Sequence, residues 1–177
     1  MTFLWATKAE RIIAEGGAVR GLLVRDLRRN RARILKGRSV LIATGGFGSN
    51  LELVRKHWPK DLPSPGRLLA GASPFATESG HEMVVAVGGV LTRMDHQWSY
   101  VLGLPDPRDS TGDRGLASFN FQAIWVNQLG KRFVQEFGDP KVLLKTLLSQ
   151  PGGSYWTVFD SEGSPSPGTT VSEKSAG

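Results

Sequence analysis

A short apolar run that ends in closely spaced glycines constrains the fold of this chain more than any other stretch. The run is Val40–Ala43, and the glycines are Gly45, Gly46 and Gly48. Such a run is typical of a strand that is buried on both faces of a sheet. Glycines directly after it allow a tight turn and a close approach of the backbone to a ligand, because no Cβ intervenes.

The residues after these glycines indicate the start of a helix. Asn50 suits an N-cap, and the apolar residues Leu51, Leu53 and Val54 begin a helical pattern. The order strand, glycine turn, helix points backbone N–H groups at the space above the sheet edge, where anionic groups bind well. Because glycine also occurs in many turns that hold no ligand, a plain strand-to-helix turn is the alternative.

The segments on either side predict a mixed fold of class α+β or α/β. An antiparallel meander is expected first, with strands at 18–24 and 32–35 and an arginine-rich turn around Asn30. Prolines at 59, 63 and 65 mark a domain boundary after a helix over 51–58. Beyond it we expect two helices, over 82–87 and over 141–148. The first of them is expected to be capped by Thr77 or Ser79 and ended by a left-handed glycine. Strands are expected at 90–94, 123–127, 132–135 and 155–159.

The net charge of +6 comes from one local stretch. Of 22 cations and 16 acids, seven cations and one acid lie between Arg25 and Arg38, so the remaining 15 of each sign cancel. The stretch contains no aromatic side chain that could stack on a base, and we therefore expect no nucleic acid. It is interpreted as a solvated hairpin turn, with a patch for a polyanion or an anionic membrane as the alternative.

Composition excludes several classes of site. The chain has no cysteine, which excludes disulfides, thiolate chemistry and cysteine-ligated metals. The three histidines, His57, His81 and His96, are far apart in the sequence and lack paired carboxylates, so we expect no metal site. No apolar run approaches the roughly 20 residues of a membrane span, and no signal peptide pattern is present. A cytoplasmic protein is the expectation.

Several short motifs occur in the order and at the spacings of one known family. They are ATGGF at 43–47, Gly80 before a helix, Met94-Asp95, Val126-Asn127 with GKRFVQE at 130–136, and Phe159-Asp160. In combination they resemble the flavoprotein family of fumarate reductases, succinate dehydrogenase flavoprotein subunits and 3-ketosteroid dehydrogenases. The resemblance implies a partial FAD-binding Rossmann-like domain at 1–60, made of the meander and the buried strand, and an α+β capping domain at 68–160. Residues 161–177 are expected to be a disordered tail, because their Ser, Pro, Gly, Thr and charged residues cannot bury apolar surface.

The same resemblance implies FAD as the cofactor. It places Thr44, Gly45 and Gly46 against FAD at the end of the buried strand, and it expects a main-chain contact from Ala9 to the adenine. Gly80 and His81, at the start of a helix, are expected near the flavin, since a positive helix end suits an anionic cofactor. Hydride would pass between the flavin and a carbon–carbon bond next to a carbonyl, in a small substrate such as a steroid-like ketone or an unsaturated acid.

Three residues are candidates for the catalytic chemistry. Tyr100 stands where fumarate reductases have a substrate-binding histidine; it could polarise a carbonyl or move a proton, or simply fill space as an aromatic plug. His96 shares a face with Tyr100 in an extended chain, and it could bind substrate or be a structural histidine. Glu136 could take part in proton transfer, or it could pair with Lys131 or Arg132.

The chain also departs from the family pattern. It has no GxGxxG, the family's TGDG is replaced by Thr77-Glu78-Ser79-Gly80, and Pro140 stands where a proton-delivering arginine is expected. Without that arginine, fumarate reduction by the family mechanism is not expected, and Tyr100 fits better with the ketosteroid-dehydrogenase-like branch. The missing GxGxxG predicts an internal fragment of an oxidoreductase. The alternative is a non-catalytic remnant, or a polyanion-binding module that uses the basic turn Arg25–Arg38. The charged loop 106–114 could contact substrate or be solvated with internal ion pairs.

Overall fold

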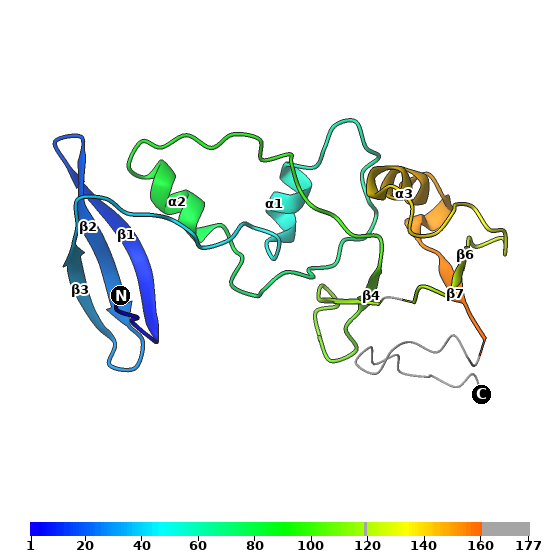
Figure 1. Cartoon of the computed structure of the whole chain (residues 1–177), viewed down its shortest axis with the longest axis horizontal. Coiled ribbons are helices and arrows are strands. Elements are labelled where there is room, and N and C mark those ends of the chain that lie inside the picture. Colours follow the sequence, from blue (N-terminus) through cyan, green and yellow to red (C-terminus); the bar gives the residue numbers. More distant parts are fainter. Residues whose placement is uncertain (119, 161–177) are drawn as a thin grey trace. The chain divides into compact units, whose positions relative to one another are not determined.

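The computed structural model describes residues 1–118 and 120–160, which form two compact units (Figure 1). The first unit contains Met1–Phe47 and Pro74–Met94, and the second contains Gly48–Ser73 and the residues from Asp95 onward. The tail expected at 161–177 lies outside the described residues. Within the described part of the chain, no helix has the length and apolar character needed to cross a membrane.

The first unit is built on an antiparallel meander of three strands in the order β1-β2-β3 (Figure 1). The strands are β1 (Thr7–Glu15), β2 (Ala18–Asp26) and β3 (Arg31–Lys36). The β1–β2 turn contains Gly16 at φ 58° and Gly17 at φ 74°, the left-handed conformations that a two-residue hairpin turn requires. The predicted strands at 18–24 and 32–35 and the arginine-rich turn between them are therefore confirmed.

Helix α2 (Ser79–Val85) contacts β1 and completes the core of this unit. Ile12, Val24 and Met83 are its buried side chains, each less than 10% exposed. The helix is followed by Gly88 at φ 85°, which confirms the predicted left-handed glycine. Its N-cap is Glu78, which makes no side-chain capping bond, so the predicted cap by Thr77 or Ser79 is wrong.

The predicted buried strand at Val40–Ala43 is wrong. The segment lies outside every strand that the structure describes, and the Leu41 side chain is 91% exposed. A strand buried in the middle of a sheet needs hydrogen-bonded neighbours on both sides. Among the described strands none pairs with this segment, because the meander ends at β3. The strand expected over 90–94 is absent from the same unit.

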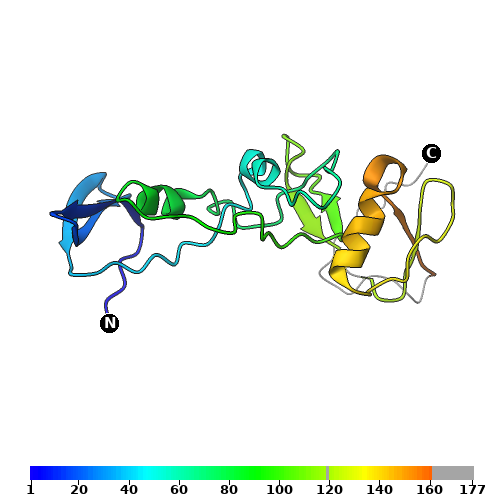
Figure 2. The ribbon, with the colours of Figure 1, turned by 90° about the horizontal axis from the view of Figure 1, so that it is seen from above.

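The second unit combines short helices with two small antiparallel sheets. Helix α1 (Leu51–Lys56) starts at the predicted cap Asn50, whose Oδ1 accepts a hydrogen bond from the Leu53 N–H at 3.2 Å. The other elements are β4 (Gly103–Pro105) paired with β5 (Gly115–Ala117), β6 (Ile124–Val126) paired with β7 (Trp156–Val158), helix α3 (Pro140–Leu148) and the 3₁₀ turn η1 (Pro151–Gly153). Figure 2 shows α3 from the side, in yellow to orange.

Trp125 on β6 is the centre of this unit's core. It is 2% exposed, and its ring lies 4.5 Å from that of Tyr155 and 5.5 Å from that of Phe137. The returning strand predicted at 132–135 is wrong, because β6 pairs with β7 and only a single bridge joins Val126 to Arg132. Helix α3 buries Leu143, whereas Val142 is 58% exposed.

Candidate functional site

A glycine turn and the start of α2 meet in the first unit. A Cβ placed on Gly80 would lie 2.0 Å from Thr44 Oγ1, so the two segments can touch only because residue 80 has no side chain. The Glu78 N–H also donates a hydrogen bond to the Gly46 carbonyl at 3.3 Å. Two sequence segments that were expected to form one site, 44–46 and 80–81, are therefore in direct contact.

The turn presents unused backbone donors to open space. Gly45 has φ 79°, and a Cβ on either Gly45 or Gly46 would meet no atom within 4 Å. The N–H groups of both glycines donate to no other group in the described part of the chain. Backbone N–H groups exposed by a glycine turn are suited to bind phosphate or hydroxyl oxygens at close range.

His81 adds a buried polar atom to this site. Its Nδ1 is buried and has no hydrogen-bond partner among the described residues, while its ring lies 6.0 Å from the Phe47 ring in an edge-on arrangement. Buried polar atoms are nearly always hydrogen-bonded, so this nitrogen is suited to a partner outside the protein chain. Together with the open donors of Gly45 and Gly46, it fits a ligand that carries both oxygen acceptors and anionic groups.

Two other residues bear on this site in different ways. Ala9, expected to contact an adenine, lies half-buried on β1 opposite Val24, and no hydrogen bond joins it to the glycine turn within the described residues. Glu78 was not predicted as a site residue, yet it adopts φ 80° directly before α2. Left-handed conformations of bulky residues are strained and gather at functional sites. The signal in the sequence is that the TGDG motif has glycine at this position.

The candidates His96 and Tyr100 both belong to the second unit. The Trp98 and Tyr100 rings are 6.1 Å apart, and residues 96, 98 and 100 are exposed while 97 and 99 are half-buried, which is consistent with the predicted alternation. Tyr100 is 70% exposed, so it is not the aromatic plug that was the alternative. His96 Nδ1 lies 3.2 Å from the Asp95 carboxylate, also at the surface. The segment offers an imidazole, an indole and a phenol to solvent or to a ligand.

Glu136 makes its side-chain contacts with Arg132 and Trp125. Its carboxylate forms an ion pair with Arg132, with Nη2–Oε2 at 2.5 Å, and accepts a hydrogen bond from the Trp125 N–H at 2.7 Å. Burial alone would raise its pKa, but the Arg132 guanidinium and the Trp125 N–H outweigh burial and hold the pKa below the ordinary value. No hydrogen bond or ion pair in the described residues joins Glu136 to Tyr100 or His96. The geometry matches the predicted pairing with Arg132.

Tyr155 is a residue that sequence reasoning missed. Its hydroxyl donates a hydrogen bond to the Val101 carbonyl at 2.8 Å, and burial raises the pKa of the phenol. Val101 follows Tyr100 directly, so Tyr155 ties the aromatic segment to the Trp125 core. No local pattern could have identified this contact, because the two residues are 54 positions apart.

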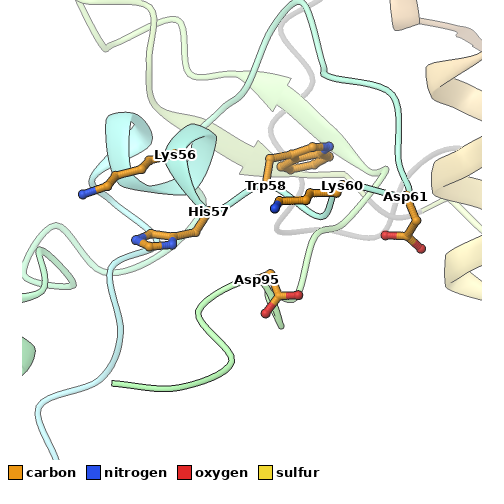
Figure 3. Close-up of a pocket in the computed structure, with 6 residues that line it drawn as sticks. All are labelled: Lys56, His57, Trp58, Lys60, Asp61 and Asp95. Atoms are coloured by element: carbon orange, nitrogen blue, oxygen red, sulfur yellow. The ribbon is translucent and has the colours of Figure 1, made fainter. Parts of the chain in front are cut away.

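A shallow depression of about 460 Å³ lies beside the Asp95–His96 pair (Figure 3). Its walls are lined by Lys56, His57, Trp58, Lys60, Asp61 and Asp95. Its charges are mixed, and none of the predicted site residues lines it. Nor do the described residues contain a cluster of three or more His, Asp or Glu side chains that could hold a metal ion.

The charged loop 106–114 is organised by contacts within itself. Asp106 is 8% exposed and receives two hydrogen bonds from the Arg108 guanidinium, at 2.9 and 3.0 Å. Asp109 accepts from the Arg114 N–H at 2.7 Å, and the Arg114 side chain reaches the Ala72 carbonyl at 2.6 Å. Asp106 and Arg108 form an ion pair within the loop, which matches the alternative of a loop with internal ion pairs.

Comparisons with known proteins extend this description. The sequence profile of the family described as "FAD binding domain" matches residues 1–160. Urocanate reductase of Eggerthella lenta is 29% identical over 161 residues, which cover 89% of this chain and 25% of that protein. A KsdD-like steroid dehydrogenase of Mycobacterium tuberculosis is 26% identical over 129 residues, which cover 70% of this chain and 23% of that protein.

A solved structure is similar to this chain at the level of the fold. It is the open conformation of a flavocytochrome c3 fumarate reductase, with a TM-score of 0.61 and 24% identity, covering 89% of this chain and 27% of that one. The likeness shows that the two share a mixed α/β fold. This chain spans about a quarter of the length of the curated relatives that it matches.

Proposed function

The chain belongs to the FAD binding domain family, whose cofactor is FAD, and from this premise we propose that its glycine turn forms part of a flavin-dependent oxidoreductase site. The proposed reaction is hydride transfer between the flavin and a carbon–carbon bond adjacent to a carbonyl. The names of two relatives, a urocanate reductase and a KsdD-like steroid dehydrogenase, support substrates of that kind, either an unsaturated acid or a steroid-like ketone.

The observation that carries the proposal is the unused set of donors around the turn. Gly45 and Gly46 leave their N–H groups and the space above them open, and the Nδ1 of His81 has no partner in the described residues. In this proposal Thr44, Gly45 and Gly46 bind FAD oxygens, Gly80 allows the close approach, and His81 hydrogen-bonds the cofactor. Ala9 remains a proposed main-chain contact to the adenine.

We propose that the exposed segment 96–100 binds the substrate and takes part in the chemistry on it. FAD supplies the redox chemistry when it is bound. The Tyr100 hydroxyl donates a hydrogen bond to the substrate carbonyl, which favours negative charge on that oxygen in the transition state. His96, kept near Asp95, orients the substrate or relays a proton to Tyr100. Glu136 is a weaker candidate for proton transfer, because Arg132 and the Trp125 N–H already occupy its oxygens.

The proposed domain organisation follows the family. Residues 1–60 would be a late part of the FAD-binding domain, and residues 68–160 would be most of a capping domain. The whole enzyme would then contain further FAD-binding segments, including a GxGxxG that is absent from these 177 residues.

Flavin binding by paired glycine variants tests the proposal. Gly46→Val places a side chain in the open space above the turn, whereas Gly71→Val does the same at a glycine that is equally unobstructed but lies in the other unit. We expect FAD fluorescence titrations to show binding at least about tenfold weaker for Gly46→Val, since the side chain excludes the ligand from its backbone donors. Gly71→Val should bind like the unmodified chain.

Two results would overturn this assignment. One is that the purified chain is colourless and takes up no added FAD. The other is that both valine variants bind FAD as tightly as the parent, because the open turn would then have no role in cofactor binding.

A further inference from the structure

The cations of the β2–β3 hairpin form a surface that the proposed flavin chemistry does not use. We propose that this surface, here called the basic hairpin, docks an acidic protein. Its members are exposed cations on the turn, on β3 and just after it: Arg28, Arg29, Arg31, Arg33, Lys36 and Arg38. They account for almost all of the local charge excess, whereas the rest of the chain is neutral.

These cations lack neutralising partners within the protein. No ion pair or hydrogen bond engages the side chains of Arg31, Arg33, Lys36 or Arg38 among the described residues. Two acids close to the hairpin, Glu10 and Asp26, already accept hydrogen bonds from other groups. Glu10 pairs with the Arg25 guanidinium, and Asp26 accepts hydrogen bonds from two backbone N–H groups in the turn. The positive field of the hairpin is therefore available to an external partner.

The hairpin turn is also preorganised. Asp26 Oδ1 accepts from the N–H groups of Arg28 at 2.9 Å and Arg29 at 3.2 Å, which closes the turn locally. Asn30 follows with φ 49°, and its Oδ1 receives a hydrogen bond from Arg25 at 3.3 Å. A turn held in this way loses little conformational entropy when a partner binds its side chains.

The composition of the surface fits a protein partner. Five of its six cations are arginines, and arginine is enriched at protein interfaces because its planar guanidinium binds carboxylates with two parallel hydrogen bonds. Two apolar side chains lie among them, Leu27 at 58% exposure and Ile34 at 56%. Exposed aliphatic groups in the same stretch as exposed cations suit an acidic protein surface with apolar positions between its carboxylates.

The geometry disfavours the other polyanions. A free two-stranded ribbon can enter the DNA major groove, but here β1 runs level with the turn, since Thr7 pairs with Asp26 and Asp26 pairs with Arg31. The hairpin is thus the end of a three-stranded sheet and not a projecting arm. Arg31 and Arg33 share one sheet face while Ile34 and Lys36 share the other, so a flat bilayer would engage only part of the set.

Two variants of equal net charge test the proposal in the full chain. The first carries Arg28→Gln, Arg29→Gln and Arg31→Gln, and the matched control carries Lys60→Gln, Lys141→Gln and Lys145→Gln at exposed positions of the other unit. Binding of fluorescent poly-L-glutamate is measured by anisotropy over a salt series. We expect the arginine variant to bind about tenfold more weakly with a shallower salt dependence, and the lysine variant to bind within about twofold of the parent.

Every other outcome contradicts the proposal. An equal loss of affinity for poly-L-glutamate in the two variants would show a general charge effect. If the parent chain did not bind poly-L-glutamate, the surface would have no affinity for acidic polypeptides. Tighter binding to duplex DNA or to phosphatidylserine vesicles at the same salt would assign the surface to a nucleic acid or a membrane. FAD titration of the same variants keeps this test separate from that of the flavin site, since neither variant changes the glycine turn.

Discussion

At the scale of single residues, Glu78 adopts a left-handed conformation that suits glycine better than a glutamate. It has φ 80° immediately before α2, where the family motif has glycine. A non-glycine residue in the left-handed region costs about 1–2 kcal/mol, and the greater freedom of glycine in the unfolded chain offsets part of that cost. We therefore predict that Glu78→Gly raises the free energy of unfolding by roughly 0.5–1 kcal/mol, measured by urea denaturation.

Glu82→Gly is the matched control for this change. Glu82 lies within α2, where glycine costs about 1 kcal/mol of helix stability. The two substitutions remove the same side chain four positions apart, and they should shift the urea midpoint in opposite directions. A loss of stability in both variants would show that the Glu78 backbone is not strained.

Part of the candidate site at the glycine turn could be predicted from the sequence. Thr44, Gly45, Gly46, Gly80 and His81 were predicted together, and all five lie around one turn, because motif spacing carries information about backbone geometry. Their roles in binding FAD stay a prediction. The unpartnered Nδ1 and the strained backbone before α2 could not be read from the sequence, because both depend on how the helix packs against the turn.

At the scale of elements, local sequence patterns predicted strand pairing correctly where the two paired strands are neighbours along the chain. The β2–β3 hairpin was predicted because its two strands are joined by a short polar turn. The apolar run Val40–Ala43 was wrongly assigned to a buried strand, because apolar character shows that a segment can form a strand but not which neighbour it pairs with. The strand predicted at 123–127 exists as β6, but its predicted pairing with 132–135 is wrong for the same reason, since its partner β7 lies some 30 residues along the chain and not in the next segment.

Helix α3 allows a prediction at this scale, because its start is defined by a single side chain. Asp139 Oδ1 accepts a hydrogen bond from the Lys141 N–H at 2.8 Å, and Pro140 occupies the first turn. Losing an N-cap costs about 0.5–2 kcal/mol, so Asp139→Ala should lower the urea midpoint. Asp139→Asn keeps an oxygen acceptor and should retain most of the stability. Equal losses in the two variants would mean that the capping bond does not stabilise the helix.

At the scale of the whole molecule, each unit contains acidic side chains whose hydrogen bonds or ion pairs favour the charged carboxylate. In the first unit, Arg25 lowers the pKa of Glu10, and backbone N–H groups lower that of Asp26. In the second unit, Arg108 lowers the pKa of Asp106, and the Arg114 N–H lowers that of Asp109. The effect of acid should therefore reach both units and not one local site.

The sign of the pH dependence follows from these shifts. Because the folded-state pKa values lie below the ordinary values of 3.8 for Asp and 4.5 for Glu, the unfolded chain binds more protons as the pH falls. The stabilisation is complete above the ordinary values and is lost as the pH drops through the lower folded-state values. We predict that the urea midpoint stays level from about pH 7 to 5 and falls steadily below about pH 4.

Glu136 provides the sharpest variant for that experiment, since burial opposes its charge while Arg132 and the Trp125 N–H maintain it. Glu136→Gln removes the ionisable group, so the variant should be less stable than the parent at pH 7 and should lose less stability between pH 5 and 3. Glu15→Gln, at an exposed position on β1, should follow the parent curve. If all three curves were parallel, the Glu136–Arg132 ion pair would contribute nothing to acid sensitivity.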